Sequence, residues 1–203
     1  MALNLEKQLL FYGAYHHDSV NVGIHIIFVP VLLLTGFLFA TNTPAIPLPD
    51  WAEIPYLPLN LGTLACVMYS SLYILMEPVA GAMLAPLLLA GTAYANHLTS
   101  TYGMTANYAA IAVHVASWIF QFVGHLAFEG RAPALLDNLV QALFLAPFFV
   151  WLEILFVFGY RPELKARLDK AVQSEIGKFK ADKEAKRLNG SVKSNESANG
   201  HAK

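Results

Sequence analysis

Long apolar segments follow one another along most of the chain, separated by short polar stretches. No Lys, Arg, Asp or Glu occurs in residues 19–49, 54–76 or 78–128. A helix that crosses a membrane needs about 20 apolar residues, so these stretches predict membrane-embedded helices. The expected segments lie near residues 20–40, 59–76, 79–96, 107–127 and 138–159.

Two connections decide how these segments are counted. Residues 41–60 contain five prolines and predict a loop at a membrane surface. Residues 76–81, with the sequence MEPVAG, predict either a tight turn between two helices or a kink in one long helix. The expected number of membrane segments is therefore four or five.

Charged residues gather at the C-terminal end. Of the 13 Lys and Arg residues, 11 lie in 161–203. Residues 161–187 predict a charged helix outside the bilayer, and residues 188–203, rich in Ser, Asn and Gly, predict a disordered tail. Because basic residues collect on the cytoplasmic side, we expect a cytoplasmic C-terminus. The pattern predicts an all-α fold, a polytopic membrane helical bundle over 1–160 followed by this helix and tail.

Composition supports the same fold class. Hydrophobic residues make up 56% of the chain and charged residues 13%, whereas soluble domains carry about 25% charged residues. The basic tail also contains acidic residues, which argues against nucleic acid as a partner. A single cysteine, Cys66, excludes an intrachain disulfide. Neither a Gly-rich phosphate loop nor a GxSxG motif occurs.

Polar residues interrupt the first apolar segment at its start, in the sequence HHDSVNVGIH. Asp18, Asn21 and His25 share one helical face, since seven residues bring a helix back to within about 20°. A helix that begins at Asp18, a good N-cap residue, would let His16 and His17 fold back toward it. The alternative is an interfacial pair of histidines beside one solitary membrane histidine. Ionisable residues within membrane segments are usually functional.

A second polar cluster lies at the end of the fourth segment. His114, Gln121 and His125 share one helical face, and Glu129 follows His125 by four residues. Glu129 is a candidate metal ligand, or an acceptor for the second ring N–H of a ligating histidine. The alternative is an ion pair between Glu129 and Arg131 at a helix end.

A resemblance to a known family rests on two stretches and one pair of residues. The stretches are FYGAYHHDSVNVGIHIIFVP (11–30) and WIFQFVGHLAFEGRAPALLDNLVQALFLAPFFVWLEILF (118–156), and the pair is NH at 96–97. Over about residues 5–170 the chain resembles the fungal 2-hydroxy-fatty-acid dioxygenases of the endoplasmic reticulum membrane, which act in phytosphingosine breakdown. The resemblance implies Fe(II)-dependent oxidation of a 2-hydroxy fatty acid by O2 to the acid one carbon shorter.

The resemblance also implies a set of site residues. Carried onto this chain, the family's histidines fall on His16, His17, His25, His97 and His125, the expected iron ligands. Imidazole suits Fe(II), and oxygenases of this kind leave coordination positions open for substrate and O2. His114 lies outside the family pattern, and Asp18 is a weaker candidate ligand. The candidate catalytic residues are Asn21, Glu129 and Arg131.

One geometric difficulty follows from these expectations. In an up-and-down bundle, His97 ends the third segment and His125 ends the fourth, which separates them by about 30 Å, the thickness of the bilayer core. A shared site then requires a broken or re-entrant segment. An even number of spans would agree with the cytoplasmic basic tail if the N-terminus is cytoplasmic too.

Two other functions compete with the dioxygenase. Paired membrane histidines also serve as axial ligands in transmembrane haem proteins that transfer electrons. A non-enzymatic transporter or scaffold would use the same histidines to relay protons or to form hydrogen bonds. The expected partners are a 2-hydroxy fatty acid, O2 and membrane lipid, and the sequence gives no oligomeric state.

Overall fold

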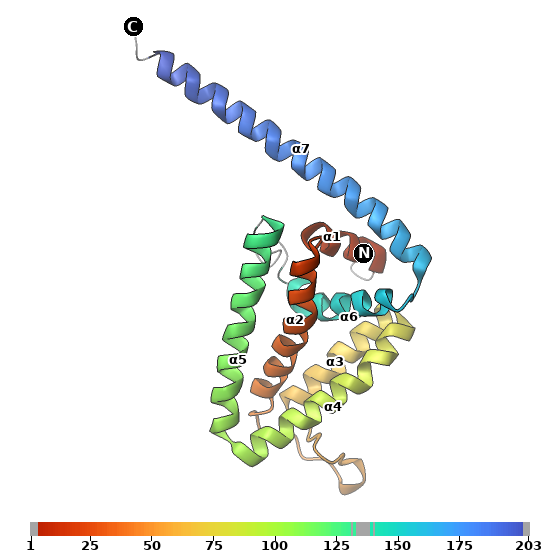
Figure 1. Cartoon of the computed structure of the whole chain (residues 1–203). Helices are drawn as coiled ribbons and strands as arrows, with labels where there is room; N and C mark the ends of the chain where they lie inside the picture. Colours follow the sequence, from red (N-terminus) through yellow and green to blue (C-terminus); the bar gives the residue numbers. More distant parts are fainter. Residues whose placement is uncertain (1–3, 131, 133–138, 140, 201–203) are drawn as a thin grey trace.

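The chain folds into helices joined by short connections (Figure 1). The computed structural model describes residues 4–130, 132, 139 and 141–200, and the side chains of all of these except 180, 183 and 186–200. Over the described residues no strand forms, and one isolated bridge joins Ile46 to Leu59. The predicted all-α class is therefore confirmed.

The elements are α1 Leu5–Tyr15, α2 Ser19–Ala40, η1 Asp50–Ala52, α3 Leu61–Met76, α4 Pro78–Tyr102, α5 Met104–Val123, η2 Gly124–Glu129, η4 Gln141–Leu145, α6 Ala146–Val157 and α7 Pro162–Gly200.

Among the described residues, three helical stretches are long and apolar enough to cross a membrane: α2, α4 and Met104–Glu129, which is α5 continued by η2. A fourth span is possible only if Gln141–Val157 and Pro162–Phe179, which meet at a bend of 116°, count as one. The number of possible membrane spans is thus three or four. It agrees with the expected four or five only if the bent pair of helices forms one span. Helix α3 has 16 residues and α6 has 12, too few for a membrane crossing of their own.

The stretch at 76–81 is a tight turn and not a kink. Helix α3 ends at Met76, and α4 begins at Pro78, where the missing N–H of proline costs nothing. The side chain of Glu77 caps α4 by accepting a hydrogen bond of 2.6 Å from the N–H of Ala80. A Cβ on Gly81 would lie 2.5 Å from the backbone of Tyr73, so glycine is required where the two helices meet.

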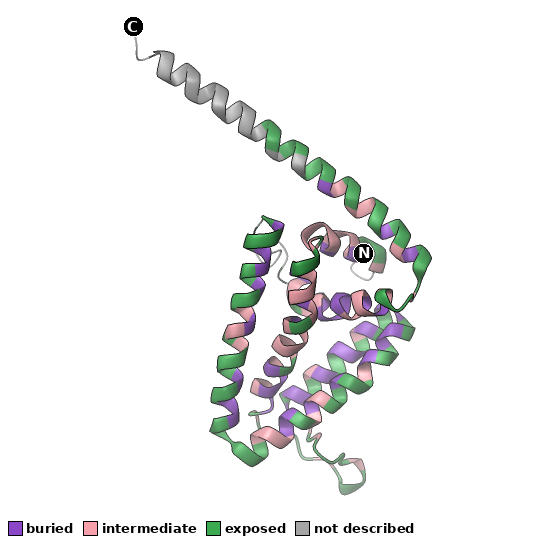
Figure 2. Cartoon of the chain, viewed as in Figure 1, coloured by how far each residue is buried: buried purple, intermediate pink, exposed green. Residues whose placement is uncertain are grey.

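The buried core lies where α6 crosses the ends of α3 and α4 (Figures 1 and 2). Tyr73, Phe148, Phe149 and Leu152 are fully buried. The ring of Phe148 stacks on that of Tyr73 at a centroid distance of 4.7 Å, and the Tyr73 hydroxyl donates to the carbonyl of Phe144. This packing fixes η4 and α6 against the α3–α4 hairpin.

Helix α1 covers α6 and is held in turn by α7. Leu9 and Tyr12, which are three residues apart on one face of α1, are buried. The Arg167 guanidinium donates to the Glu6 carboxylate, and this hydrogen bond lowers the pKa of Glu6. Helix α7 runs on through residues 188–200, where the sequence predicts a disordered tail. The division into 1–160, 161–187 and 188–203 stays a prediction.

Candidate metal centre

The corner between α1 and α2 folds the first histidine pair back over α2. Helix α1 ends at Tyr15 and α2 begins at Ser19. Asp18 is the N-cap of α2, as the sequence predicts: its Oδ1 accepts from the backbone N–H groups of Val20 at 2.9 Å and Asn21 at 3.3 Å. This cap leaves residues 16 and 17 in the short connection, with their rings facing α2 and η2.

Three imidazole rings meet behind this corner. His16, His25 and His125 each offer one ring nitrogen, and these nitrogens lie within 4.8 Å of one another. The His16 centroid lies 4.3 Å from that of His25 and 4.7 Å from that of His125, and 4.9 Å separates the last two. His25 and His125 are buried and His16 is half-buried. The residues come from the α1–α2 corner, α2 and η2, which lie close together in Figure 1.

The backbone sets the protonation of two of these rings. Nδ1 of His16 lies 2.9 Å from the Tyr12 carbonyl, and Nδ1 of His25 lies 2.9 Å from the Asn21 carbonyl. A carbonyl oxygen only accepts, so each Nδ1 carries a proton and each Nε2 of a neutral ring carries a lone pair. The two Nε2 atoms face each other at 3.0 Å. Two lone pairs at that distance repel unless a cation lies beside both, so the donor set fits a metal ion that binds imidazole.

His125 reaches this centre because α5 changes its winding. After Val123 the helix continues as the π-helical turn η2, a distortion that is frequent at functional sites. Gly124 allows the close approach that this needs: a Cβ there would lie 2.4 Å from Oδ1 of Asn21. Asn21 is itself fully buried. Helix α2 and the turn η2 therefore touch at Asn21 and Gly124, which brings His25 and His125 together.

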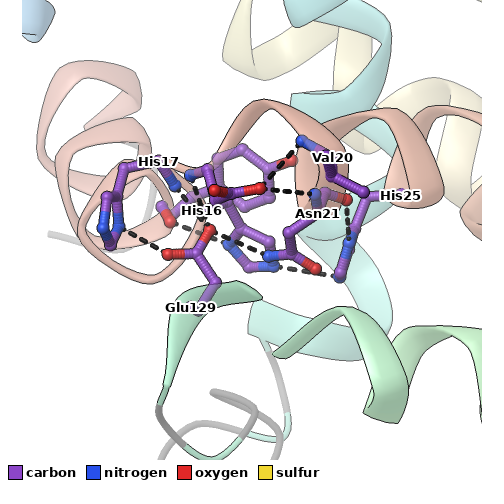
Figure 3. A network of polar contacts seen from close by, with 8 residues as sticks. His16, His17, Val20, Asn21, His25 and Glu129 are labelled. Carbon is purple, nitrogen blue, oxygen red and sulfur yellow. Dashed lines mark hydrogen bonds and ion pairs between the residues drawn. The ribbon is translucent and has the colours of Figure 1, made fainter. Parts of the chain in front are cut away.

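Glu129 ties the corner to the end of η2 (Figure 3). Its Oε1 accepts from the backbone N–H of His17 at 2.7 Å, the backbone N–H of Asp18 at 2.9 Å and Nδ2 of Asn21 at 3.0 Å. Its Oε2 lies 2.6 Å from Nδ1 of His17. The Glu129 side chain is buried completely and lies at the N-terminus of α2, where the helix dipole favours a negative charge.

These contacts separate the predicted site residues into groups. Of the histidines expected as ligands, the structure gathers His16, His25 and His125, while His17 pairs with Glu129 instead. Within the part of the chain that the structure describes, Glu129 does not belong to the group that could hold a metal. Its partner is His17, which does not belong to that group either, so the expected bond from Glu129 to a ligating histidine stays a prediction. The expected pair with Arg131 lies outside the described residues.

His97 lies apart from the cluster. It sits near the end of α4, with its ring 5.7 Å from that of Tyr56 and its Nδ1 3.4 Å from the Thr101 hydroxyl. Helix α5 starts at this end and runs about 30 Å before it reaches His125. The up-and-down arrangement of α4 and α5 is kept (Figure 1), so the structure does not bring His97 to the three other histidines.

An apolar cavity of about 540 Å³ starts at the three histidines. One face of α2, from His25 to Ala40, forms one wall. Residues of α5 and η2 between His114 and His125 form another. Within its wall, Nδ1 of His114 lies 2.7 Å from the Thr35 hydroxyl, and Trp118 donates to Nε2 of His114 at 3.1 Å. Both His114 nitrogens are therefore used, in agreement with its place outside the predicted ligand set.

Comparison with known proteins assigns the family. Residues 2–158 match the model of a family described as Mpo1-like, 2-hydroxy-palmitic acid dioxygenase Mpo1-like. The chain belongs to this family. It is also 39% identical over 169 residues to the 2-hydroxy-palmitic acid dioxygenase MPO1 of Saccharomyces cerevisiae, covering 82% of this chain and 88% of the relative. No solved structure matches the chain.

Family membership confirms the resemblance seen in the sequence and favours neither the haem protein nor the transporter or scaffold. The matched region holds α1 to α6, and thus the three histidines, Glu129 and the cavity. It ends before α7 begins at Pro162. The region that the family shares therefore includes all the helices that form this centre.

Proposed function

We propose that the protein is an Fe(II)-dependent dioxygenase that converts a 2-hydroxy fatty acid to the fatty acid one carbon shorter. The observation that carries this proposal is the placement of three imidazoles at one end of a long apolar cavity. The printed name of the yeast relative, a 2-hydroxy-palmitic acid dioxygenase, supports the substrate class.

His16, His25 and His125 would hold the iron. Two of them present an Nε2 lone pair because their Nδ1 protons are bound to backbone carbonyls. Bound iron supplies the one-electron chemistry that O2 needs to react with an organic acid. Three protein ligands leave positions open for the substrate and O2, as in other non-haem iron oxygenases. In this proposal His17 and His97 are not ligands.

Glu129 and Asn21 act as positioning residues. The Glu129 carboxylate binds two backbone N–H groups of the α1–α2 corner and the side chains of His17 and Asn21. His16 directly precedes the two residues whose N–H groups Glu129 binds, and His125 lies on the same π-helical turn as Glu129. Glu129 thereby holds His16 close to His125. Arg131 stays a candidate catalytic residue, which would pair with the substrate carboxylate or with Glu129.

The cavity would bind the acyl chain. Each buried CH2 contributes about 0.8 kcal/mol, and the walls are mostly aliphatic and aromatic side chains. The outer faces of the helices expose many large apolar side chains, which fits contact with lipid. A substrate that partitions into the bilayer would then lie beside the helices that form the cavity wall. We place the protein in the endoplasmic reticulum membrane with its basic C-terminal region in the cytoplasm.

The test is turnover by purified protein. The detergent-purified chain is loaded with Fe(II) without oxygen, and O2 uptake is followed with 2-hydroxypalmitate or with palmitate as control. We expect uptake with the 2-hydroxy acid alone and a product one carbon shorter by mass spectrometry. His25→Ala should abolish turnover while circular dichroism stays unchanged, and His97→Ala should retain it. Absence of uptake by iron-loaded wild-type protein would overturn the proposal.

A further inference from the structure

The cavity follows a single face of α2 for most of the length of that helix. The lining residues of α2 recur at intervals of three and four, which is the spacing of one helical face. They are His25, Val29, Leu32, Leu33, Gly36, Phe37 and Ala40. The cavity is therefore elongated along the helix axis, with the histidine cluster at one end.

Two positions on this face have little or no side chain. Gly36 lies 11 residues after His25, about 16 Å along the helix axis, and Ala40 lies about 22 Å along it. A Cβ added to Gly36 would meet no atom within 4 Å, so the space beside it is open. Ala65 of α3 lines the same cavity. The lining side chains are thus smallest where an acyl chain bound at the histidines would extend furthest.

These distances correspond to acyl chain lengths. An extended chain with C–C bonds of about 1.5 Å advances roughly 1.3 Å per carbon. With the carboxyl end at His25, Gly36 lies beside about the thirteenth carbon and Ala40 beside about the seventeenth. A chain of about 16 carbons would then end between these two residues, and any side chain at position 36 would occupy the path of its last carbons.

We propose that Gly36 determines chain-length specificity: its missing side chain keeps the cavity open for the last carbons of a long 2-hydroxy fatty acid. This inference rests on the proposed function, because it takes the histidines as the site of the acid group. His114 and Trp118 face the same stretch from α5, where Thr35 bonds His114. Their hydrogen bonds hold this part of the cavity wall in place. The wall therefore cannot move aside to make room for both a larger side chain at position 36 and the acyl chain.

The test compares Gly36→Leu with Gly23→Leu. Gly23 lies on the same helix, also has open space where a Cβ would lie, and does not line the cavity, so it controls for replacing glycine in α2. Binding of 2-hydroxy acids with 8 to 18 carbons is measured by calorimetry on iron-loaded protein without oxygen, and turnover is measured on the same protein with oxygen.

In wild type and in Gly23→Leu, affinity should rise about fourfold per added carbon up to about 16 carbons. In Gly36→Leu the rise should stop near 12 carbons, which weakens binding of 2-hydroxypalmitate roughly 250-fold and leaves 2-hydroxydodecanoate within about threefold. Ala40→Leu should leave the limit at about 16 carbons, because Ala40 lies beside about the seventeenth carbon. Turnover should follow the same order of chain lengths.

The outcomes separate the inference from the function on which it rests. Equal chain-length profiles for wild type and Gly36→Leu, with turnover intact, would overturn the role of Gly36 alone. A uniform loss at every chain length in Gly36→Leu would also overturn it, because a specificity residue spares short substrates. No turnover by wild-type protein at any length would contradict the proposed function itself.

Discussion

The Nε2 atoms of His16 and His25 lie 3.0 Å apart, and each ring bonds a backbone carbonyl through its Nδ1. Both carbonyls belong to residues four positions earlier in the chain, Tyr12 and Asn21. Two helices that meet at a capped corner thus orient two imidazoles toward one point. His125 completes the group from a third element.

Replacing Glu129 should loosen this centre. In Glu129→Gln an amide replaces a buried carboxylate that accepts three N–H hydrogen bonds and pairs with the His17 ring, which we expect to cost about 2 kcal/mol and several degrees in Tm. Thermal unfolding followed by tryptophan fluorescence measures this loss. Fe(II) affinity should also fall, roughly tenfold.

The control for Glu129 is Glu53→Gln, because Glu53 is exposed in the loop between α2 and α3. It should leave both Tm and iron affinity unchanged. A drop in Tm for Glu129→Gln with iron affinity intact would show that Glu129 stabilises the fold without positioning the histidines.

A methyl group at Gly124 should separate α2 from η2. In Gly124→Ala the new Cβ meets Oδ1 of the buried Asn21 at 2.4 Å, an overlap that costs about 1–3 kcal/mol. We expect a lower Tm and weaker iron binding. Gly23→Ala is the matched variant, since its Cβ meets no atom within 4 Å. Equal Tm values for the two variants would contradict the close contact.

His114 should prove dispensable for metal binding. Its two ring nitrogens bond Thr35 and Trp118, and it does not belong to the three-histidine group. His114→Phe keeps a ring in the cavity wall but loses both hydrogen bonds, which should lower stability by about 1–2 kcal/mol. Iron content, measured by mass spectrometry, should equal that of wild type. Loss of iron with the fold retained would place His114 in the site.

The last part of α7 should be dispensable. The buried α7 side chains among those described are Leu164, Leu168 and Ile176, and Val172 contacts Gly13 of α1. Deletion of residues 181–203 should therefore leave Tm and turnover within error of wild type. Leu168→Asp should lower Tm, because it places a charge in the core between α1 and α6. Inactivation by the deletion would assign a function to the end of α7.

Local sequence signals predicted the corner and the helices well. Asp18 is a strong N-cap residue, and its placement before an apolar run predicts both the start of α2 and the return of His16 toward it. The four-residue spacing of Asn21 and His25 and the eleven-residue spacing of His114 and His125 also placed the members of each pair on a shared helical face.

Tertiary packing decided what local signals left open. His97 has the residue type expected of a ligand, but the turn at Gly103, with φ of 52°, sends α5 away from it along the full length of the bundle. His17 looked equivalent to His16, and only the position of Glu129 on η2 assigns it to another partner. The roles of Gly36 and Gly124 depend on the space beside the first and the neighbouring helix beside the second. A single sequence does not show which helices pack together, so it could not predict these roles.

The most direct test of the central claim is Fe(II) binding under anaerobic conditions, measured on desalted protein by mass spectrometry with circular dichroism as the check on folding. The account predicts one iron per chain in wild type and in His97→Ala, and at least roughly tenfold weaker binding in His16→Ala, His25→Ala and His125→Ala. Iron retained by a folded variant lacking all three histidines, or lost in His97→Ala, would contradict it.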